Sequence, residues 1–268
     1  DWRPRNFRDK YHGEVSARYA LAHSLNVPAV RVGEMAGMKA LSRQFREFFF
    51  PDQEVYNRRF RRDLTIAIGS LEMSPLEMAV AYSAFGNNGV IHRPYLIRRI
   101  ETRDGEALYD SQNVDEFGMK APARRRVMPG DVAMVMASLL KDSARKGGAR
   151  FKRDNFLGKT GTSNNNRDAW FVGVVPGLSA AVWVGYDNPR NSMGKATGSA
   201  VAGPLWGRIV TRGWRRAGSF NFKPSAIYLD FCEESGQLAH RGCPRVKQEI
   251  YAGSLGRPAR CTKHAHQN

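Results

Sequence analysis

Residues 156–186 read FLGKTGTSNNNRDAWFVGVVPGLSAAVWVGY, and this stretch decides the fold. Its apolar and β-branched residues form three short runs typical of strands, at about 156–162, 169–175 and 179–186. Three consecutive asparagines separate the first two runs, and a Pro-Gly pair separates the last two. Because such short connections join neighbouring antiparallel strands, the pattern predicts a three-stranded antiparallel sheet.

Helical patterns surround this predicted sheet. The best marked one runs over 75–85, where Ser74 is a helix cap and Glu77 completes a capping box. Apolar spacing and proline positions predict the others at 14–23, from Pro28, through Leu41, Phe45 and Phe48, from Val132 to Gly147, and from Pro204 to Trp214. A hairpin is expected at 95–109, around Asp104-Gly105.

These elements predict an α+β domain over residues 1–216, an antiparallel sheet flanked by helices with a helical lobe. Residues 217–268 are expected to form a separate, loop-rich tail that contains all three cysteines. A chain of 268 residues has enough volume for one such domain and a small appendage.

The net charge of +17 favours anionic partners: membrane surfaces, cell-wall polymers, lipid pyrophosphates or nucleic acid. A solvated arginine-rich surface explains the excess equally well, because runs such as Arg124-Arg125-Arg126 have no interleaved aromatic residues for base stacking. No apolar run approaches the roughly 20 residues that span a bilayer. The chain opens on Asp1-Trp2-Arg3-Pro4, without Met and unlike a signal peptide, so we expect that it was cut from a longer precursor.

Cys232, Cys243 and Cys261 lie in the tail, separated by ten and then seventeen residues. This is not the spacing of a zinc site, so we expect no metal ligands and no cofactor. One disulfide with one cysteine left over would suit an oxidising compartment, and three unpaired thiols are an equally good interpretation.

The first chemically suggestive segment is Gly158-Lys159-Thr160-Gly161-Thr162. On a strand, Lys159 and Gly161 share one face while Thr160 and Thr162 share the other. Gly161 has no side chain to block a ligand lying along the backbone, so an extended peptide could add itself as a further strand. Lys159 supplies positive charge for a carboxylate or a developing negative charge. Without further support, a solvated strand end is the simpler interpretation.

The second segment is Ser24-Leu25-Asn26, between a predicted helix and Pro28. A turn there would let the Ser24 hydroxyl and the Asn26 amide face one cleft. The alternative is that Ser24 and Asn26 only cap helix ends.

Both segments belong to longer stretches that resemble class A, bifunctional penicillin-binding proteins. The stretches are Tyr19–Val30 (YALAHSLNVPAV), Ala67–Gly89 (AIGSLEMSPLEMAVAYSAFGNNG), Gly158–Asp187 (GKTGTSNNNRDAWFVGVVPGLSAAVWVGYD) and Thr197–Trp206 (TGSAVAGPLW), and the resemblance covers about residues 11–216. The family pairs a Ser-x-x-Lys element with an S-x-N element and a Lys-Thr-Gly element. The resemblance implies the fold that penicillin-binding transpeptidases share with serine β-lactamases.

The resemblance also implies roles for individual residues. Ser24 would relay a proton toward the leaving group, Asn26 would hold the acyl side chain of the substrate, and Lys159 would set the electrostatics. Thr160 and Thr162 would bind the substrate or penicillin carboxylate, and the backbone N–H of Thr162 would be half of the oxyanion hole.

The chain departs from the family pattern in one respect. The family's Ser-x-x-Lys nucleophile lies upstream of the S-x-N element, and the 23 residues before Ser24 contain no such motif. Later matches begin at Ser143 and Ser192, but Ser143 falls in the last turn of a predicted helix and Ser192 opens no helical pattern, so neither gains from a helix N-terminus. We expect the nucleophile segment and its first strands to be missing here, which would leave strand 179–186 as an unpaired edge.

The resemblance implies a D,D-transpeptidase that cross-links peptidoglycan stem peptides through a serine ester and reacts with β-lactam antibiotics. It places the protein at the periplasmic face of the bacterial inner membrane, attached through its missing N-terminal part, with no nucleic-acid partner. One rival is a penicillin-hydrolysing or penicillin-sensing acyl-enzyme. The other is a non-catalytic basic module that binds nucleic acid or an anionic cell-wall polymer.

Overall fold

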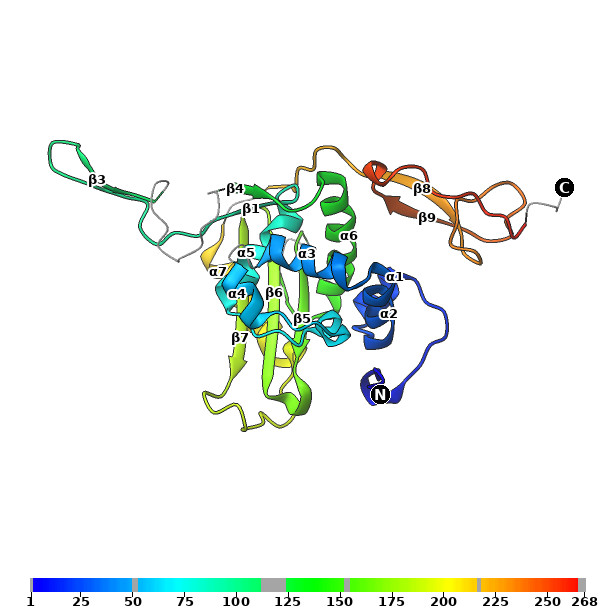
Figure 1. Cartoon of the computed structure of the whole chain (residues 1–268), viewed down its shortest axis with the longest axis horizontal. Helices are drawn as coiled ribbons and strands as arrows, with labels where there is room; N and C mark the ends of the chain where they lie inside the picture. The colour runs from blue at the N-terminus through cyan, green and yellow to red at the C-terminus, as the bar shows by residue number, and fades with distance from the viewer. Residues whose placement is uncertain (1, 50–52, 112–123, 152–154, 216–217, 265–268) are drawn as a thin grey trace.

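The computed structural model describes residues 2–49, 53–111, 124–151, 155–215 and 218–264 (Figure 1). The elements are η1 (Phe7–Asp9), α1 (Ala17–Ala22), α2 (Asn26–Ala36), α3 (Met38–Phe48), α4 (Gln53–Arg59), η2 (Leu64–Ile68), α5 (Pro75–Gly86), β1 (Val90–His92), β2 (Arg99–Glu101), β3 (Ala107–Asp110), β4 (Arg124–Arg126), α6 (Gly130–Lys146), β5 (Leu157–Thr162), η3 (Asn164–Asn166), β6 (Asp168–Val175), β7 (Leu178–Gly185), η4 (Gly198–Ala202), α7 (Gly203–Gly213), β8 (Ile227–Cys232), β9 (Val246–Tyr251) and η5 (Gly253–Leu255).

Strands β5, β6 and β7 form one antiparallel sheet in that order, which confirms the predicted sheet. The central strand β6 is buried along most of its length, as its nearly continuous apolar sequence requires. Within the described ranges β5 and β7 each pair with β6 alone. The expectation that strand 179–186 is an edge is therefore confirmed.

Helices cover both faces of this sheet (Figure 1). Side chains alternate along β6, so Phe171 and Val175 point to one face and Val174 to the other. Phe171 and Val175 pack with Trp206 of α7, whereas Val174 packs with Leu140 of α6 and with side chains of α5. The sheet is the middle of three layers, and the predicted α+β class is confirmed.

Trp206 is the largest fully buried side chain. Its indole N–H donates to the carbonyl oxygen of Ala180 at 3.0 Å, and its ring lies 5.1 Å from the Phe171 ring, centroid to centroid. A Cβ atom on Gly173 would lie 2.6 Å from Trp206 Cζ2, so β6 accepts the indole only because position 173 has no side chain.

The remaining helices form the predicted lobe beside the sheet. The rings of Tyr56, Phe60 and Phe45 share a small core with Ile66 and Leu41. Helix α5 begins with the predicted capping box, in which the Ser74 hydroxyl accepts from Glu77 N–H and the Glu77 carboxylate accepts from Ser74 N–H. None of the helices in the part of the chain that the structure describes is both long and apolar enough to cross a bilayer.

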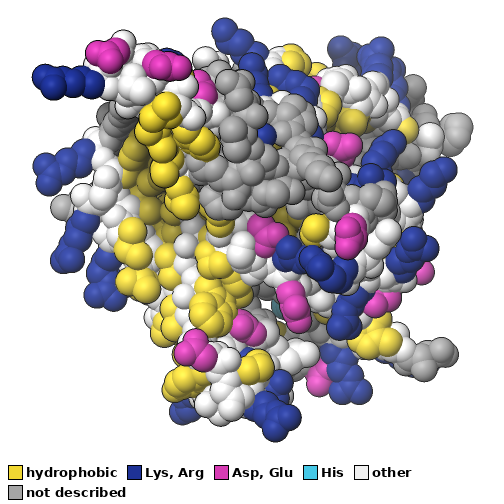
Figure 2. Space-filling model, turned by 60° about the vertical axis from the view of Figure 1, so that its left-hand side comes forward, with side chains coloured by type: hydrophobic (Ala, Val, Ile, Leu, Met, Phe, Trp, Pro, Cys, Tyr) yellow, Lys and Arg dark blue, Asp and Glu magenta, His cyan; other side chains and the backbone are white. Residues whose placement is uncertain are grey.

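The β2–β3 hairpin extends away from the rest of the domain (Figure 1). It forms around Asp104-Gly105 as predicted, although its first strand begins only at Arg99. Leu96, just before the hairpin, is 84% exposed, and Leu108, in β3, is 67% exposed. Figure 2 shows a band of hydrophobic side chains on this side of the molecule, with Lys and Arg spread around its edges. On this face the basic residues are dispersed and do not line a single groove.

The tail is more regular than the sequence suggested, because β8 and β9 pair as an antiparallel hairpin over six residue pairs. All three cysteines of the chain are free thiols. The division into domains at residues 216 and 217 stays a prediction, since those two residues lie outside the described ranges.

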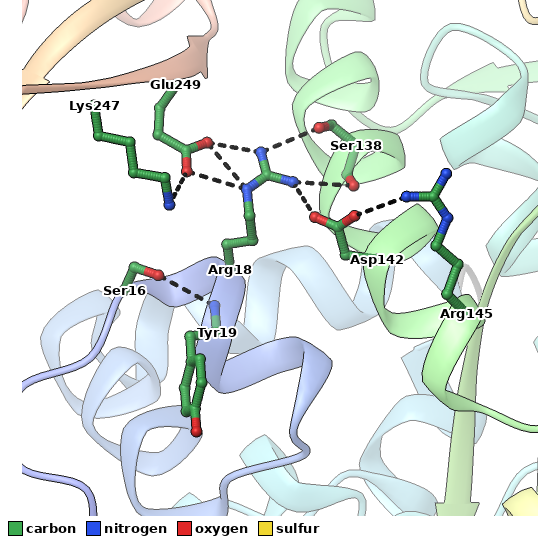
Figure 3. A network of polar contacts seen from close by, with 8 residues as sticks. All are labelled: Ser16, Arg18, Tyr19, Ser138, Asp142, Arg145, Lys247 and Glu249. Carbon is green, nitrogen blue, oxygen red and sulfur yellow. Dashed lines mark hydrogen bonds and ion pairs between the residues drawn. The ribbon is translucent and has the colours of Figure 1, made fainter.

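A polar network attaches the tail to the domain (Figure 3). Arg18 of α1 is paired with Asp142 of α6 at 2.6 Å and with Glu249 of β9 at 2.7 Å. Its guanidinium also donates to the hydroxyl and the carbonyl oxygen of Ser138, and Lys247 contacts Glu249 at 3.0 Å. Burial opposes ionisation of Glu249, but the hydrogen bonds from Arg18 and Lys247 outweigh it and lower the pKa of this carboxyl.

We predict that Glu249→Gln lowers the free energy of unfolding by about 1–3 kcal/mol at neutral pH, because Arg18 then loses a charged acceptor in a partly buried position. The lowered pKa of Glu249 makes its stabilising effect fully present above the ordinary value of 4.5, and the effect is lost as the pH falls through the lowered value. Urea unfolding of the original chain and of the Glu249→Gln variant as a function of pH measures the loss of stability and its pH dependence.

Glu233→Gln is the matched control, since Glu233 is exposed on the same tail and its substitution should change stability by less than about 0.5 kcal/mol. Equal effects of the two substitutions, or a Glu249→Gln effect that persists unchanged in acid, would contradict this role of the network.

Candidate active site around Lys159 and Ser24

Strand β5 places the Lys-Thr-Gly segment at an edge of the sheet. In the described residues β5 pairs with β6 on one side only, where Lys159 opposes Val172 and Gly161 opposes Trp170. Gly158 is held close to Phe171, because a Cβ atom there would lie 2.6 Å from the Phe171 ring. Packing of Gly158 against Phe171 therefore fixes the position of β5, while the outer edge of β5 has no strand partner among the described residues.

Ser24 lies in the tight turn between α1 and α2. Its φ of 52° is left-handed, a conformation that costs a residue other than glycine about 1–2 kcal/mol. Two backbone hydrogen bonds hold it, from Ser24 N–H to the carbonyl of Leu21 at 3.2 Å and from Leu25 N–H to that of Ala20 at 2.9 Å. This is the helix ending in which glycine is the usual left-handed residue, so the hydroxyl at this position is kept at a conformational cost.

The fold brings Ser24 and Lys159 together, although 135 positions separate them in the sequence. The Lys159 ammonium donates a hydrogen bond to the Ser24 hydroxyl and a second one to the carbonyl oxygen of Thr160 at 3.1 Å. Lys159 is half-buried, and burial lowers its pKa to about 8. Lys159 is thus not a solvated strand end, and its proton is held less tightly than that of an ordinary lysine.

The side chains of Thr160 and Thr162 lie close to η4. Thr162 Oγ1 accepts from the N–H of Gly198 at 3.0 Å, and the Thr160 side chain packs near Gly147 and Gly198. A Cβ atom on Gly198 would lie 2.6 Å from the carbonyl oxygen of Gly161, so η4 lies directly against β5. Gly198 was not among the predicted site residues, although its place in the Thr197–Trp206 stretch could have indicated it.

Asn26 begins α2, two residues after Ser24. Its amide donates to the carbonyl oxygen of Arg5 at 2.9 Å and does not cap the helix. Ser24 ends α1 through its backbone, but its hydroxyl contacts Lys159. Neither side chain therefore caps a helix, as the alternative interpretation required.

His23 and Lys146 fix the same turn, and the sequence analysis did not identify them. His23 Nδ1 lies 2.9 Å from the carbonyl oxygen of Tyr19, and His23 Nε2 lies 2.5 Å from the Lys146 ammonium. Only a neutral ring with its proton on Nδ1 satisfies both contacts, since the carbonyl must accept and the ammonium must donate. Lys146, the last residue of α6, thereby holds the residue that precedes Ser24.

The later Ser-x-x-Lys matches at Ser143 and Ser192 lie where they were expected, and a third match, at Ser138, lies in the middle of α6. Ser143 is buried near the C-terminal end of α6. Ser192 lies outside any helix, and its hydroxyl donates to the carbonyl oxygen of Asn165 at 2.6 Å. None of these serines stands at a helix N-terminus, as an activated nucleophile with its lysine one turn on would require.

The absence of a metal site stays a prediction, although the tail brings four possible metal ligands together. The tail folds so that one ligand atom from each of Cys232, Cys243, Cys261 and His264 lies within 4.8 Å of all the others. The fourth possible ligand is a histidine, His264, which follows Cys261 by three residues and is not part of the cysteine spacing.

The model of one known family, described as the penicillin binding protein transpeptidase domain, matches residues 1–211. Penicillin-binding protein 1A of Aquifex aeolicus is 33% identical over 258 residues, which are 95% of this chain and 34% of that protein. Penicillin-binding protein 1A of Neisseria gonorrhoeae is 35% identical over 210 residues, 76% of this chain and 25% of that protein. The chain thus spans about a third or less of the length of these curated relatives.

Two crystal structures have the same fold. Penicillin-binding protein 1A from Haemophilus influenzae superposes with a TM-score of 0.78 at 23% identity, over 97% of this chain and 43% of that one. The PonA1 protein from Mycobacterium tuberculosis, in complex with penicillin V, superposes with a TM-score of 0.70 at 20% identity, over 82% of this chain and 62% of that one.

We predict that Lys159 titrates at about pH 8 in the folded chain and near 10.5 when the chain is unfolded in urea, because only the folded state buries its ammonium. Between these pH values the folded state binds fewer protons than the unfolded state. The free energy of unfolding therefore rises as the pH rises from about 8 to about 10.5. Trace acetylation of Lys159 at a series of pH values, read by mass spectrometry, measures both midpoints. The same midpoint in the folded and unfolded chain would contradict the buried position.

Proposed function

The chain belongs to the penicillin-binding protein transpeptidase family, and from this membership we propose that it forms the larger part of a serine D,D-transpeptidase site. The substrate class is the D-Ala-D-Ala end of peptidoglycan stem peptides, and β-lactams react at the same site. The observation that carries the proposal is the hydrogen bond from the Lys159 ammonium to the Ser24 hydroxyl, beside a strand edge that has no partner in the described part of the chain.

The chemistry is acyl transfer. A nucleophilic serine attacks the penultimate D-alanine carbonyl, terminal D-alanine leaves, and the resulting ester is then attacked by an amine of a neighbouring stem peptide. Ser24 passes a proton to the leaving nitrogen, and Lys159 stabilises that relay and attracts the terminal carboxylate. With a pKa of about 8, Lys159 is still largely protonated at neutral pH yet yields a proton more easily than a solvated lysine.

The substrate lies along the outer edge of β5 as an added strand. Gly161 leaves room for the peptide, the hydroxyls of Thr160 and Thr162 bind the carboxylate, and the N–H of Thr162 completes an oxyanion hole with the N–H of the nucleophile. Asn26 orients the acyl side chain. The Thr162 hydroxyl already accepts from Gly198 N–H and remains able to donate its own proton to a carboxylate.

The nucleophile of this proposal is the serine of an upstream Ser-x-x-Lys element in the full-length protein, where that serine can begin a helix beside Lys159. We place the protein at the periplasmic face of the inner membrane, where its substrate is found, with membrane attachment through segments outside residues 1–268. The penicillin V complex of the M. tuberculosis neighbour supports β-lactams as ligands. The rival of a basic binding module has no observation in its favour.

We predict that the 268-residue chain by itself forms no covalent adduct with a fluorescent penicillin, because it contains no serine at a helix N-terminus with lysine one turn on. Intact-protein mass spectrometry after incubation checks this. A stoichiometric adduct would contradict it, and its position, at Ser143 or Ser192, would identify the serine whose environment we have misjudged.

In the full-length protein we predict that Lys159→Ala lowers the second-order rate of acylation by about 10²- to 10⁴-fold, the range for one positioned proton-transfer or charge-stabilising group. The melting temperature should hardly change, because the side chain makes two polar contacts and costs desolvation energy.

Lys195→Ala is the matched control, since Lys195 is exposed in the loop before η4 and should leave the rate unchanged. A loss of less than about tenfold for Lys159→Ala falls below the range for a catalytic group and would remove Lys159 from the site.

A further inference from the structure

The tail gathers three thiols and an imidazole at one buried point. Cys232 is fully buried, Cys261 is 3% exposed, His264 is 6% exposed and Cys243 is half-buried. His264 Nδ1 lies 3.6 Å from Cys232 Sγ and 3.4 Å from Cys261 Sγ. The four possible ligand atoms lie within 4.8 Å of one another.

These separations match the edges of a metal-centred tetrahedron. Zinc binds thiolate sulfur at about 2.3 Å and imidazole nitrogen at about 2.0–2.1 Å, which sets sulfur and nitrogen about 3.6 Å apart at tetrahedral angles. Both measured sulfur–nitrogen distances are close to that value. Cys261 and His264 are also three positions apart in the sequence, a short chelating pair of the kind found in structural zinc sites.

A carboxylate supports the imidazole from its far side. His264 Nε2 lies 3.3 Å from Glu234 Oε2, and Lys263 contacts the same oxygen at 3.1 Å. With Nε2 facing the carboxylate, Nδ1 of the neutral ring is the nitrogen available to a metal, and it lies beside the sulfur atoms. A metal-binding histidine whose second nitrogen donates to a carboxylate is the usual support for such a ligand.

The backbone holds each cysteine in place without help from a metal. Cys232 N–H donates to Gln237 O at 2.8 Å, and Cys261 N–H donates to Leu238 O at 2.9 Å. Cys243 closes a short turn in which its sulfur accepts from the N–H of His240 at 3.5 Å. The three sulfur atoms are thus positioned by three separate sets of backbone contacts, of which that of Cys261 joins distant segments of the tail.

Apart from Phe220 and Phe222, which pack against the cluster of Leu140 and Val174 in the domain, the tail buries little apolar surface. In residues 218–264, which the structure describes in full, Ile250 is the one large aliphatic side chain that is buried, whereas Ile227 and Tyr228 of β8 are 47% and 60% exposed. A segment of fewer than about 50 residues cannot bury enough apolar surface on its own and usually needs a disulfide or a metal.

We propose that Cys232, Cys243, Cys261 and His264 bind one structural zinc ion that closes the C-terminal tail. All four positions of a tetrahedral site come from the protein, so no position is open for substrate. Three thiolates and a neutral imidazole favour Zn²⁺ over harder cations such as Mg²⁺ or Ca²⁺. The proposal does not rest on the transpeptidase function, and it assigns the tail a site of its own.

The competing arrangement is one disulfide with a spare thiol. A disulfide would use two of the three sulfur atoms, and it would assign no role to the burial of His264 or to its contact with Glu234. Zinc uses all four groups at once.

The test uses the 268-residue chain, purified without added metal. We expect about one zinc per chain by elemental analysis, three thiols that react with a thiol reagent only after a chelator is added, and, after replacement by Co²⁺, the thiolate-to-metal charge-transfer absorption and strong visible bands of tetrahedral cobalt. These measurements need no variant and so do not depend on whether a variant folds.

Variants then assign the ligands. Affinity measured against a chromophoric chelator should fall by more than about 100-fold for His264→Ala and Cys261→Ser, and by about 10- to 100-fold for Glu234→Gln, which acts only through His264. His92→Ala is the matched control, since it removes an exposed imidazole of β1 and should leave zinc content and affinity unchanged.

Three results would overturn the proposal: a folded chain with reduced thiols that retains no zinc and gives no tetrahedral cobalt spectrum, a native disulfide between two of these cysteines, or His264→Ala with unchanged affinity and an unchanged cobalt spectrum. A zinc site with no β-lactam reactivity in the full-length protein would leave this proposal intact and contradict only the proposed function.

Discussion

The structure depends on the burial of strand β6 on both faces. Its side chains alternate between two apolar clusters, so helices must cover both sides of the sheet and polar chemistry is confined to the sheet edges and to the turns between helices. Trp206 shows how tight this constraint is, because the indole fits against β6 only over Gly173. The outer edge of β5 has no strand partner among the described residues.

The two groups at that edge are held at a cost to stability. Ser24 takes a left-handed conformation that glycine would adopt without strain, and Lys159 is half-buried although burial disfavours its charge. The surrounding contacts over-determine both: backbone hydrogen bonds and the His23–Lys146 contact fix the turn, and the core packing of Gly158 fixes the strand. Such local costs, compensated by rigid neighbours, are typical of residues retained for chemistry.

The tail achieves its order by different means. The domain is stabilised by large buried side chains, whereas the tail buries thiols, an imidazole and one isoleucine. Its attachment to the domain is partly apolar, where Phe220 and Phe222 pack against the cluster of Leu140 and Val174, and partly polar, where Arg18 contacts Asp142 and Glu249. Arg18 lies on α1, six residues before Ser24.

The sequence by itself determined the elements of the domain. The three strands, the capped helix after Ser74 and the Asp104-Gly105 hairpin all follow from local rules of alternation, capping and turn chemistry. The structure has each of them, although the first strand of the hairpin begins four residues later than predicted. The sequence also singled out Lys159, but as one of two open interpretations. Only the tertiary structure decided that Lys159 contacts Ser24, that Gly198 lies on Thr162, and that His264 joins three cysteines. These contacts join residues far apart along the chain. Local periodicity holds no information about them, because they form only when packing around β6 and the turns of the tail bring distant segments together.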